Sequence, residues 1–220
     1  CLLVSENRPE WLISDLSIML SGGITVPAYT TYTERDYEYI INDCTPSILI
    51  ISDKTLYSKI KTIIPKKKFI KKIIFFESID DFDSTFHLNI NEIFEKKISS
   101  SKDFFNLDIQ RKDIACIIYT SGTQGNPKGV MLSHGGILNN CEGANLLLKE
   151  FISKIPKFLT WLPLSHSYEH TVQFVQIVVG AQVFYAESID KLIKNMGDCS
   201  PEIMTAVPRF YQNLYQKINV

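Results

Sequence analysis

Residues 117–134 read IIYTSGTQGNPKGVMLSH, and this stretch is the most informative part of the 220-residue chain. An apolar run ends at Tyr119, and a segment rich in glycine, serine and threonine follows it directly. Gly122 and Gly125 allow the backbone to turn tightly and to approach a ligand closely. Successive backbone N–H groups in such a turn can converge on an anion. The sequence therefore predicts an anion-binding loop directly after a buried strand.

The side chains of this loop suit a polyphosphate. The hydroxyls of Thr120, Ser121 and Thr123 can bind phosphate oxygens or help to ligate a hard cation such as Mg²⁺. Lys128 adds a mobile positive charge, and Pro127 fixes the backbone immediately before it. Backbone donors, hydroxyls and one lysine together are the groups that a nucleoside triphosphate requires.

Two common nucleotide-binding patterns do not match this loop. In the P-loop pattern GxxxxGK[ST] the lysine follows a glycine, whereas Lys128 follows a proline and precedes Gly129. The dinucleotide pattern GxGxxG does not fit because Gly122 and Gly125 form only GxxG. The alternative without a ligand is a glycine-rich hairpin turn, which we consider weaker because the run is long and follows a buried strand.

Apolar segments of two lengths alternate along the rest of the chain. Short runs rich in β-branched or aromatic residues indicate buried strands at Ile24–Val26, Ile48–Ile51, Ile73–Phe76, Ile114–Tyr119, Phe158–Trp161, Val183–Tyr185 and Ile203–Val207. Longer segments with helical periodicity lie between them, at Pro9–Leu20, Thr33–Asn42 and Ser133–Leu148 and from Tyr168 and Pro208 onward. This alternation predicts an α/β fold with a mostly parallel sheet flanked by helices.

Several helix ends carry recognisable signals. Pro9 suits a first helical turn, and Gly22–Gly23 suits the end of the same helix. Thr33 and Asp36 have the spacing of a capping box, and Ser133 is placed to cap the helix that follows it. These signals predict where the helices begin and end.

Composition limits the possible functions. The net charge of −1 gives no overall attraction to nucleic acid, so we expect no nucleic-acid partner. No apolar run reaches the roughly 18 residues that a membrane span needs. The five cysteines are scattered without a CxxC pair, which indicates reduced thiols in a cytoplasmic protein. Peripheral contact with a membrane stays open.

Residues 52–112 differ in composition from the segments on either side. They carry the basic runs Lys66–Lys68 and Lys71–Lys72, an acidic run around Asp80–Asp83, and the serines Ser99–Ser101. A basic run can bind an anionic surface. We favour the simpler interpretation, a solvated and variable excursion from the fold.

The loop resembles a known family. Residues 119–130, YTSGTQGNPKGV, resemble the phosphate-loop signature of the adenylate-forming (AMP-binding) superfamily, with Gln124 where the usual form has threonine. The resemblance implies that the residues from Thr120 to Gly125, together with Lys128, bind the phosphates of ATP. It also implies that Thr120 helps to hold Mg²⁺. The loop residues concerned are Thr120, Ser121, Gly122, Thr123, Gln124 and Gly125.

A second segment carries the finer resemblance. Residues 162–171, LPLSHSYEHT, are similar to the segment of long-chain acyl-CoA synthetases in which a histidine–aromatic pair faces the acyl carboxylate. By this resemblance His166 lies near the reacting carboxylate and Tyr168 lines the acyl path, so His166 and Lys128 become the expected catalytic residues. Glu169 and His170 are expected to be helix-start groups.

The resemblance implies a long-chain fatty acid–CoA ligase that uses ATP, Mg²⁺ and coenzyme A. Residues 1–220 then form an incomplete AMP-binding N-terminal domain, with first α/β units at 1–51, the excursion at 52–112, and the phosphate loop and acyl-site segment at 113–220. We expect the C-terminal domain to be absent and this piece alone to be inactive. Activation of an aryl or short-chain acid, or nucleotide binding without catalysis, remains an alternative.

Overall fold

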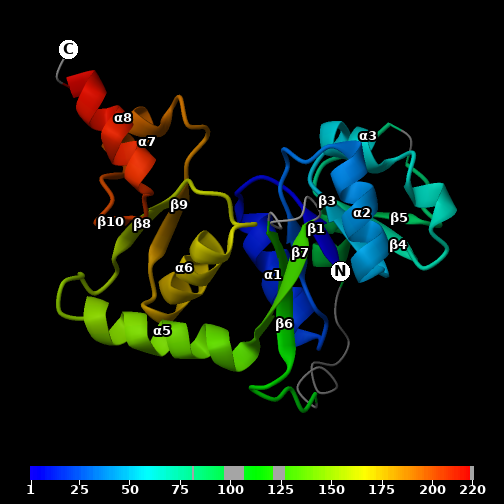
Figure 1. Ribbon diagram of the computed structural model, residues 1–220, viewed down its shortest axis with the longest axis horizontal. Helices are drawn as coiled ribbons and strands as arrows, with labels where there is room; N and C mark the ends of the chain where they lie inside the picture. Colours follow the sequence, from blue (N-terminus) through cyan, green and yellow to red (C-terminus); the bar gives the residue numbers. More distant parts are fainter. Residues whose placement is uncertain (81, 97–106, 121–126, 219–220) are drawn as a thin grey trace. The chain divides into compact units, whose positions relative to one another are not determined.

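The computed structural model of the chain describes residues 1–80, 82–96, 107–120 and 127–218 (Figure 1). The chain forms two compact units, Cys1–Leu138 and Asn139–Val220. Within the described ranges, no helix is long and apolar enough to cross a membrane.

A parallel sheet forms the centre of the first unit. Its strand order is β2-β1-β3-β4-β5. The strands are β1 (Leu2–Val4), β2 (Val26–Ala28), β3 (Ile48–Ile51), β4 (Lys72–Phe75) and β5 (His87–Asn89). Because the chain passes from β1 to β2 on one side and then to β3 on the other, the order reverses between β1 and β3. In such sheets the carboxyl edge at the reversal is the usual place for a ligand.

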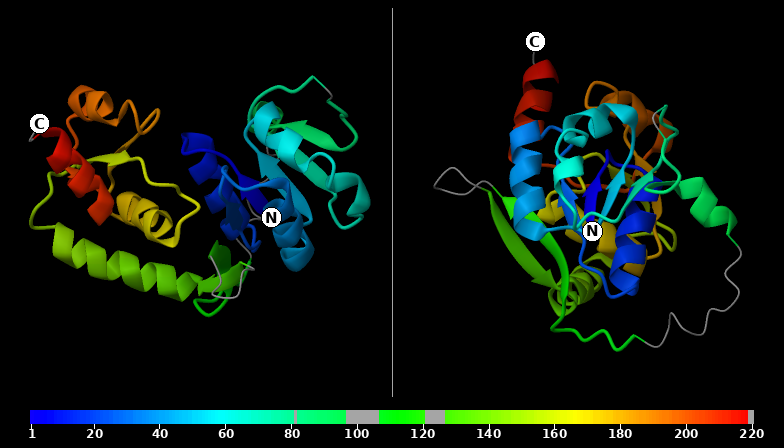
Figure 2. Two further views of the ribbon diagram at one scale, coloured as in Figure 1. Left: turned by 45° about the horizontal axis from the view of Figure 1, so that its top comes forward. Right: turned by 90° about the vertical axis from the view of Figure 1, so that its right-hand side faces the viewer.

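Helices cover both faces of this sheet (Figure 2). They are α1 (Pro9–Leu20), α2 (Glu34–Cys44), α3 (Lys54–Ile60), a 3-10 turn (Ile64–Lys66) and α4 (Ile90–Glu95). Right-handed crossovers place α1 on one face and α2 and α3 on the other. The main core forms where Tyr37, Ile40 and Ile60 pack against alternate strand residues such as Leu49 and Ile73.

The helix-end signals are confirmed. Pro9 is the first residue of α1, and Gly22, at φ +74°, closes the helix with Gly23 by donating to the carbonyls of Met19 and Ile18. A left-handed residue at this position is the usual helix stop.

The capping box at the start of α2 is also confirmed. The backbone N–H of Thr33 donates to Asp36 Oδ2 at 2.9 Å, and the Asp36 N–H donates back to Thr33 Oγ1.

An antiparallel hairpin ends the first unit. It consists of β6 (Ile114–Thr120) and β7 (Lys128–Ser133), and Thr25 bridges to Cys116 beside it. Ser133 Oγ accepts from the Gly136 N–H at 3.1 Å and so caps α5 (His134–Leu148), as predicted. Strand β7 was not predicted, because its exposed outer residues break the continuous apolar pattern that marks the other strands.

The second unit contains a smaller parallel sheet of order β10-β8-β9. Its strands are β8 (Lys157–Thr160), β9 (Gln182–Tyr185) and β10 (Ile203–Met204), and its helices are α6 (Ser167–Val178), α7 (Leu192–Cys199) and α8 (Pro208–Ile218). Leu159, Leu192 and Cys199 form a core with partly buried neighbours such as Trp161. The strand order again reverses, here between β8 and β10.

The expected α/β architecture with parallel sheets flanked by helices is confirmed. Residues 52–112, which we expected to be a solvated and variable excursion, contribute β4 and β5 to the first sheet. Three amines of their basic runs bond to the protein's own acceptors: Lys71 Nζ to the Lys68 carbonyl at 3.0 Å, Lys72 Nζ to the Thr85 carbonyl at 2.6 Å, and Lys67 Nζ to Asn42.

Candidate functional site

The β6–β7 hairpin brings together two of the expected site residues. Thr120 and Lys128 are directly opposite each other in the antiparallel register, and both are exposed. Side chains paired in this way lie on the same face, with Cβ atoms about 5 Å apart. The two side chains therefore leave the same face of the hairpin, at the residues that flank 121–126. Five expected phosphate ligands fall outside the described residues: Ser121, Gly122, Thr123, Gln124 and Gly125.

A side chain larger than hydrogen would not fit at Gly129, the residue after Lys128. A Cβ placed on Gly129 would lie 2.8 Å from Cγ2 of Ile117 and 3.3 Å from Cζ of Tyr119. Cγ2 belongs to a β-branched side chain that cannot easily move aside. Gly129 is paired with Tyr119 across the hairpin, so its small size leaves room for the tyrosine ring over β7.

Tyr119, near the end of β6, forms hydrogen bonds to two other segments of the first unit. Its hydroxyl lies 2.5 Å from Oδ2 of Asp43, in the last turn of α2, and its carbonyl accepts from the Tyr32 hydroxyl at 3.4 Å. Burial and the neighbouring Asp43 carboxylate raise the pKa of Tyr119 well above its usual value, so the hydroxyl stays a donor. Sequence reasoning missed Asp43 because no local pattern connects residues 76 positions apart.

His166 lies at the carboxyl edge of the second sheet, where the chain leaves β8 and enters α6. It is the N-cap residue of α6, and its Nδ1 accepts from the backbone N–H of Tyr168 at 3.2 Å. A neutral imidazole that accepts at Nδ1 carries its proton on Nε2. Exposed His166 therefore presents an Nε2–H donor. Tyr168, in the first turn of α6, is 49% exposed.

A buried polar cluster begins in the turn of α6 that His166 caps, at the reversal between β8 and β10. Thr205, just after β10, donates its hydroxyl to Oε2 of Glu169 at 2.5 Å, and its carbonyl accepts from Nε1 of Trp161 at 2.6 Å. Burial raises the pKa of Glu169 to about 7, although hydrogen bonds from Thr205 and Thr160 act in the opposite direction. Glu169 lies in the first turn of α6, as predicted, and its side chain is buried.

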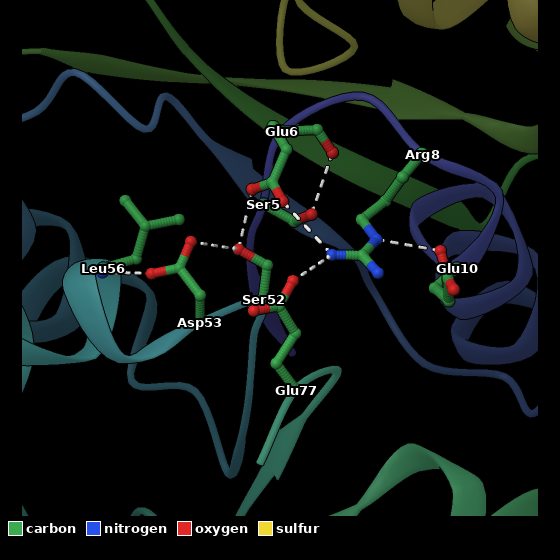
Figure 3. Close-up of polar contacts among 8 residues, drawn as sticks. All are labelled: Ser5, Glu6, Arg8, Glu10, Ser52, Asp53, Leu56 and Glu77. Carbon is green, nitrogen blue, oxygen red and sulfur yellow. Dashed lines mark hydrogen bonds and ion pairs between the residues drawn. The ribbon is translucent and has the colours of Figure 1, made fainter. Parts of the chain in front are cut away.

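The reversal point of the first sheet is occupied by the protein's own ion pairs (Figure 3). Arg8 donates from Nη1 to Glu77 Oε1 at 2.9 Å and from Nε to Glu10 Oε2 at 2.9 Å. Ser52 Oγ, just after β3, donates to Oε2 of Glu6 at 2.7 Å. This network joins the segments that follow β1, β3 and β4. The charged residues after β1, Glu6, Arg8 and Glu10, therefore have a structural role.

The described residues do not by themselves make a metal site. Across the described ranges no group of three or more histidine, cysteine, aspartate or glutamate side chains could hold a metal ion. Thr120 contributes one hydroxyl, whereas Mg²⁺ is usually held by carboxylates together with substrate phosphates and water. None of the five cysteines, all of which lie within the described residues, forms a disulfide. Burial raises the pKa of Cys44 to about 11 and of Cys116 to about 12, which makes both poor nucleophiles.

The sequence of the chain matches a known protein family. The family model described as "AMP-binding enzyme" matches residues 1–219. Long chain acyl-CoA synthetase 4 of Arabidopsis thaliana is 32% identical over 225 residues, which cover 98% of this chain and 34% of that protein. Fatty acyl-CoA synthetase A of Dictyostelium discoideum is 28% identical, with 98% of this chain and 33% of that protein covered. The chain thus spans about a third of the length of these curated relatives.

Solved structures share the fold. A putative long-chain-fatty-acid CoA ligase from Rhodopseudomonas palustris matches with a TM-score of 0.80 at 18% identity, over 98% of this chain and 52% of that one. A red-emitting luciferase from Phrixothrix hirtus matches with a TM-score of 0.75 at 19% identity, over 90% of this chain and 38% of that one. With the match over residues 1–219, these findings show that the chain belongs to the AMP-binding enzyme family.

Proposed function

We propose that the polypeptide containing this chain activates a fatty acid with ATP, forming an acyl-adenylate and then an acyl-CoA thioester. The observation that carries the proposal is the pairing of Lys128 with Thr120 at the two ends of the glycine-rich loop. The curated relatives, whose names are those of acyl-CoA synthetases, support the reaction class.

The first step brings a carboxylate to the α-phosphate of ATP and expels pyrophosphate. Both reactants are anions, so their charges must be offset. In this proposal Lys128 and the loop hydroxyls oppose the charge of the phosphates. The Nε2–H group of His166 donates to the oxygen that gains charge near the α-phosphate. Removing one preorganised donor of this kind has cost roughly 10²–10³ in rate elsewhere.

Further parts of the proposal follow from the same residues. Thr120 would offer one oxygen to Mg²⁺, and coenzyme A would be the thiol that accepts the acyl group. Tyr168, half-exposed beside His166, would line the path of the acyl chain. A long-chain acid is the proposed substrate because residues 162–171 are similar to the corresponding segment of long-chain synthetases and the relatives carry that name. Peripheral attachment to a membrane is compatible with such a substrate.

The test is ATP–pyrophosphate exchange by the full-length polypeptide with palmitate, octanoate, acetate and benzoate as separate substrates. We expect exchange that depends on palmitate and is weaker with the short and aromatic acids. If exchange is fastest with acetate or benzoate, the proposal of a long-chain substrate is wrong and the substrate is that other acid. ATP binding without exchange on any acid would indicate a nucleotide-binding protein that lacks the transfer reaction.

A further inference from the structure

The buried polar side chains of α6, the helix that His166 caps, have no part in the proposed function. On α6, Glu169, Gln173 and Gln176 lie on one face, since they are spaced by four and three residues. Their exposed fractions are 1%, 0% and 2%. Burying such groups costs free energy unless they are hydrogen-bonded. Three polar side chains on one buried helix face therefore require an explanation.

Hydrogen bonds connect this face to the ends of two strands. Gln176 Nε2 donates to Thr160 Oγ1 at 2.9 Å, at the end of β8. Thr205, after β10, reaches the carboxyl group of Glu169 at 2.5 Å. Glu169 thus joins the first turn of α6 to the segment after β10, and Gln176 joins the same helix face to the end of β8.

We propose that Glu169 is a positioning residue that sets the place of His166 by tying the first turn of α6 to Thr205. This inference rests on the proposed acid-activating function. His166 is the cap of the same turn, and its ring is fixed to the Tyr168 N–H. A shift of the turn therefore moves the Nε2–H donor by a similar amount.

The size of the expected effect follows from this geometry. A displacement of about 1 Å in a reacting group can cost roughly 10²-fold in rate. Glu169→Ala removes the carboxyl group, and Thr205→Val removes the hydroxyl that meets it. We expect each to lower the maximal rate of ATP–pyrophosphate exchange by about 10- to 100-fold, with the KM for ATP little changed.

Conservative variants and a matched control separate positioning from stability. Glu169→Gln and Thr205→Ser keep the hydrogen-bonding shape and should restore most of the rate. Glu202→Gln is the control, because Glu202 also accepts a hydroxyl, from Ser153 at 2.7 Å, but lies at the amino end of β10. It should retain the wild-type rate. All variants are assayed in the full-length polypeptide well below their melting temperatures. If Glu169→Ala does not fold, Thr205→Val tests the same hydrogen bond.

A double-mutant cycle tests whether Glu169 acts through His166. His166→Asn keeps a capping side chain but loses the Nε2–H donor. We expect Glu169→Ala to cost little more in this background than His166→Asn alone. Fully additive losses, or a Glu169→Ala enzyme with the wild-type rate, would overturn the inference and leave the proposed function in place. A wild-type polypeptide without exchange on any acid would refute the proposed function itself.

Discussion

Replacing Glu169 by glutamine should change how the stability of the second unit depends on pH. The buried carboxyl group has a pKa of about 7, against 4.5 for an ordinary glutamate. A carboxyl group with a higher pKa in the folded state takes up a proton on folding. Its contribution to stability is therefore present at low pH and is lost as the pH rises from 4.5 to about 7.

The magnitude follows from the same shift. One pKa unit corresponds to about 1.4 kcal/mol. A rise from 4.5 to about 7 thus corresponds to about 3 kcal/mol of unfolding free energy, of which about 2 kcal/mol falls between pH 5.5 and pH 8.5. Glutamine has no proton to lose. The free energy of unfolding of Glu169→Gln, relative to wild type, should rise by about 2 kcal/mol over this range.

Tryptophan fluorescence offers a local assay. The chain has two tryptophans, and Trp161 bonds directly to Thr205 beside the carboxyl group. In a Trp11→Phe background, urea unfolding followed by fluorescence reports the surroundings of Trp161. Comparing the two proteins at each pH cancels the titration of all other groups. A stability difference that is the same at pH 5.5 and 8.5, or that moves in wild type's favour, would refute a buried carboxyl group that takes up a proton on folding.

Three further substitutions test the first unit. Tyr119→Phe removes the hydroxyl that meets Asp43 and should lower the unfolding free energy by about 1–3 kcal/mol in urea titrations; unchanged stability would mean that this contact contributes nothing. Gly129→Ala should lower the melting temperature and weaken ATP binding, because the new Cβ would lie 2.8 Å from a neighbouring methyl group; normal values of both would contradict the steric argument. Thr33→Ala removes the capping box shared with Asp36 and should cost about 1 kcal/mol while ATP affinity stays the same; an equal loss of affinity would show that its effect is not local.

The sequence predicted those features that depend on neighbouring residues. The predictions that α1 begins at Pro9 and ends before Gly22–Gly23 are confirmed, because a helix end depends on only a few neighbouring residues. The strand at Ile48–Ile51 has the predicted bounds because its continuous apolar run lies in the middle of the sheet. Strand β7 escaped prediction because its stability comes from pairing with β6 rather than from an apolar pattern of its own.

Contacts between distant segments could not be predicted in the same way. The partner of Tyr119 lies in α2, and the partner of Glu169 lies 36 residues further along the chain. Glu169 lies within the segment 162–171, three residues after His166, and has the sequence context of an ordinary helix-start carboxylate. Its contact with Thr205 forms because β10 lies beside β8, the strand that precedes α6.

The central claim is that the loop between Thr120 and Lys128 binds the phosphates of a nucleotide. Isothermal titration of the full-length polypeptide with ATP and Mg²⁺ tests it most directly, comparing Lys128→Ala with Lys112→Ala. Lys112 is also exposed but lies just before β6, at the other end of the hairpin. A hydrogen bond to a charged group contributes about 1.5–3 kcal/mol, so Lys128→Ala should bind ATP roughly 10- to 100-fold more weakly than wild type. Lys112→Ala should bind normally, whereas wild-type affinity in Lys128→Ala would contradict the claim.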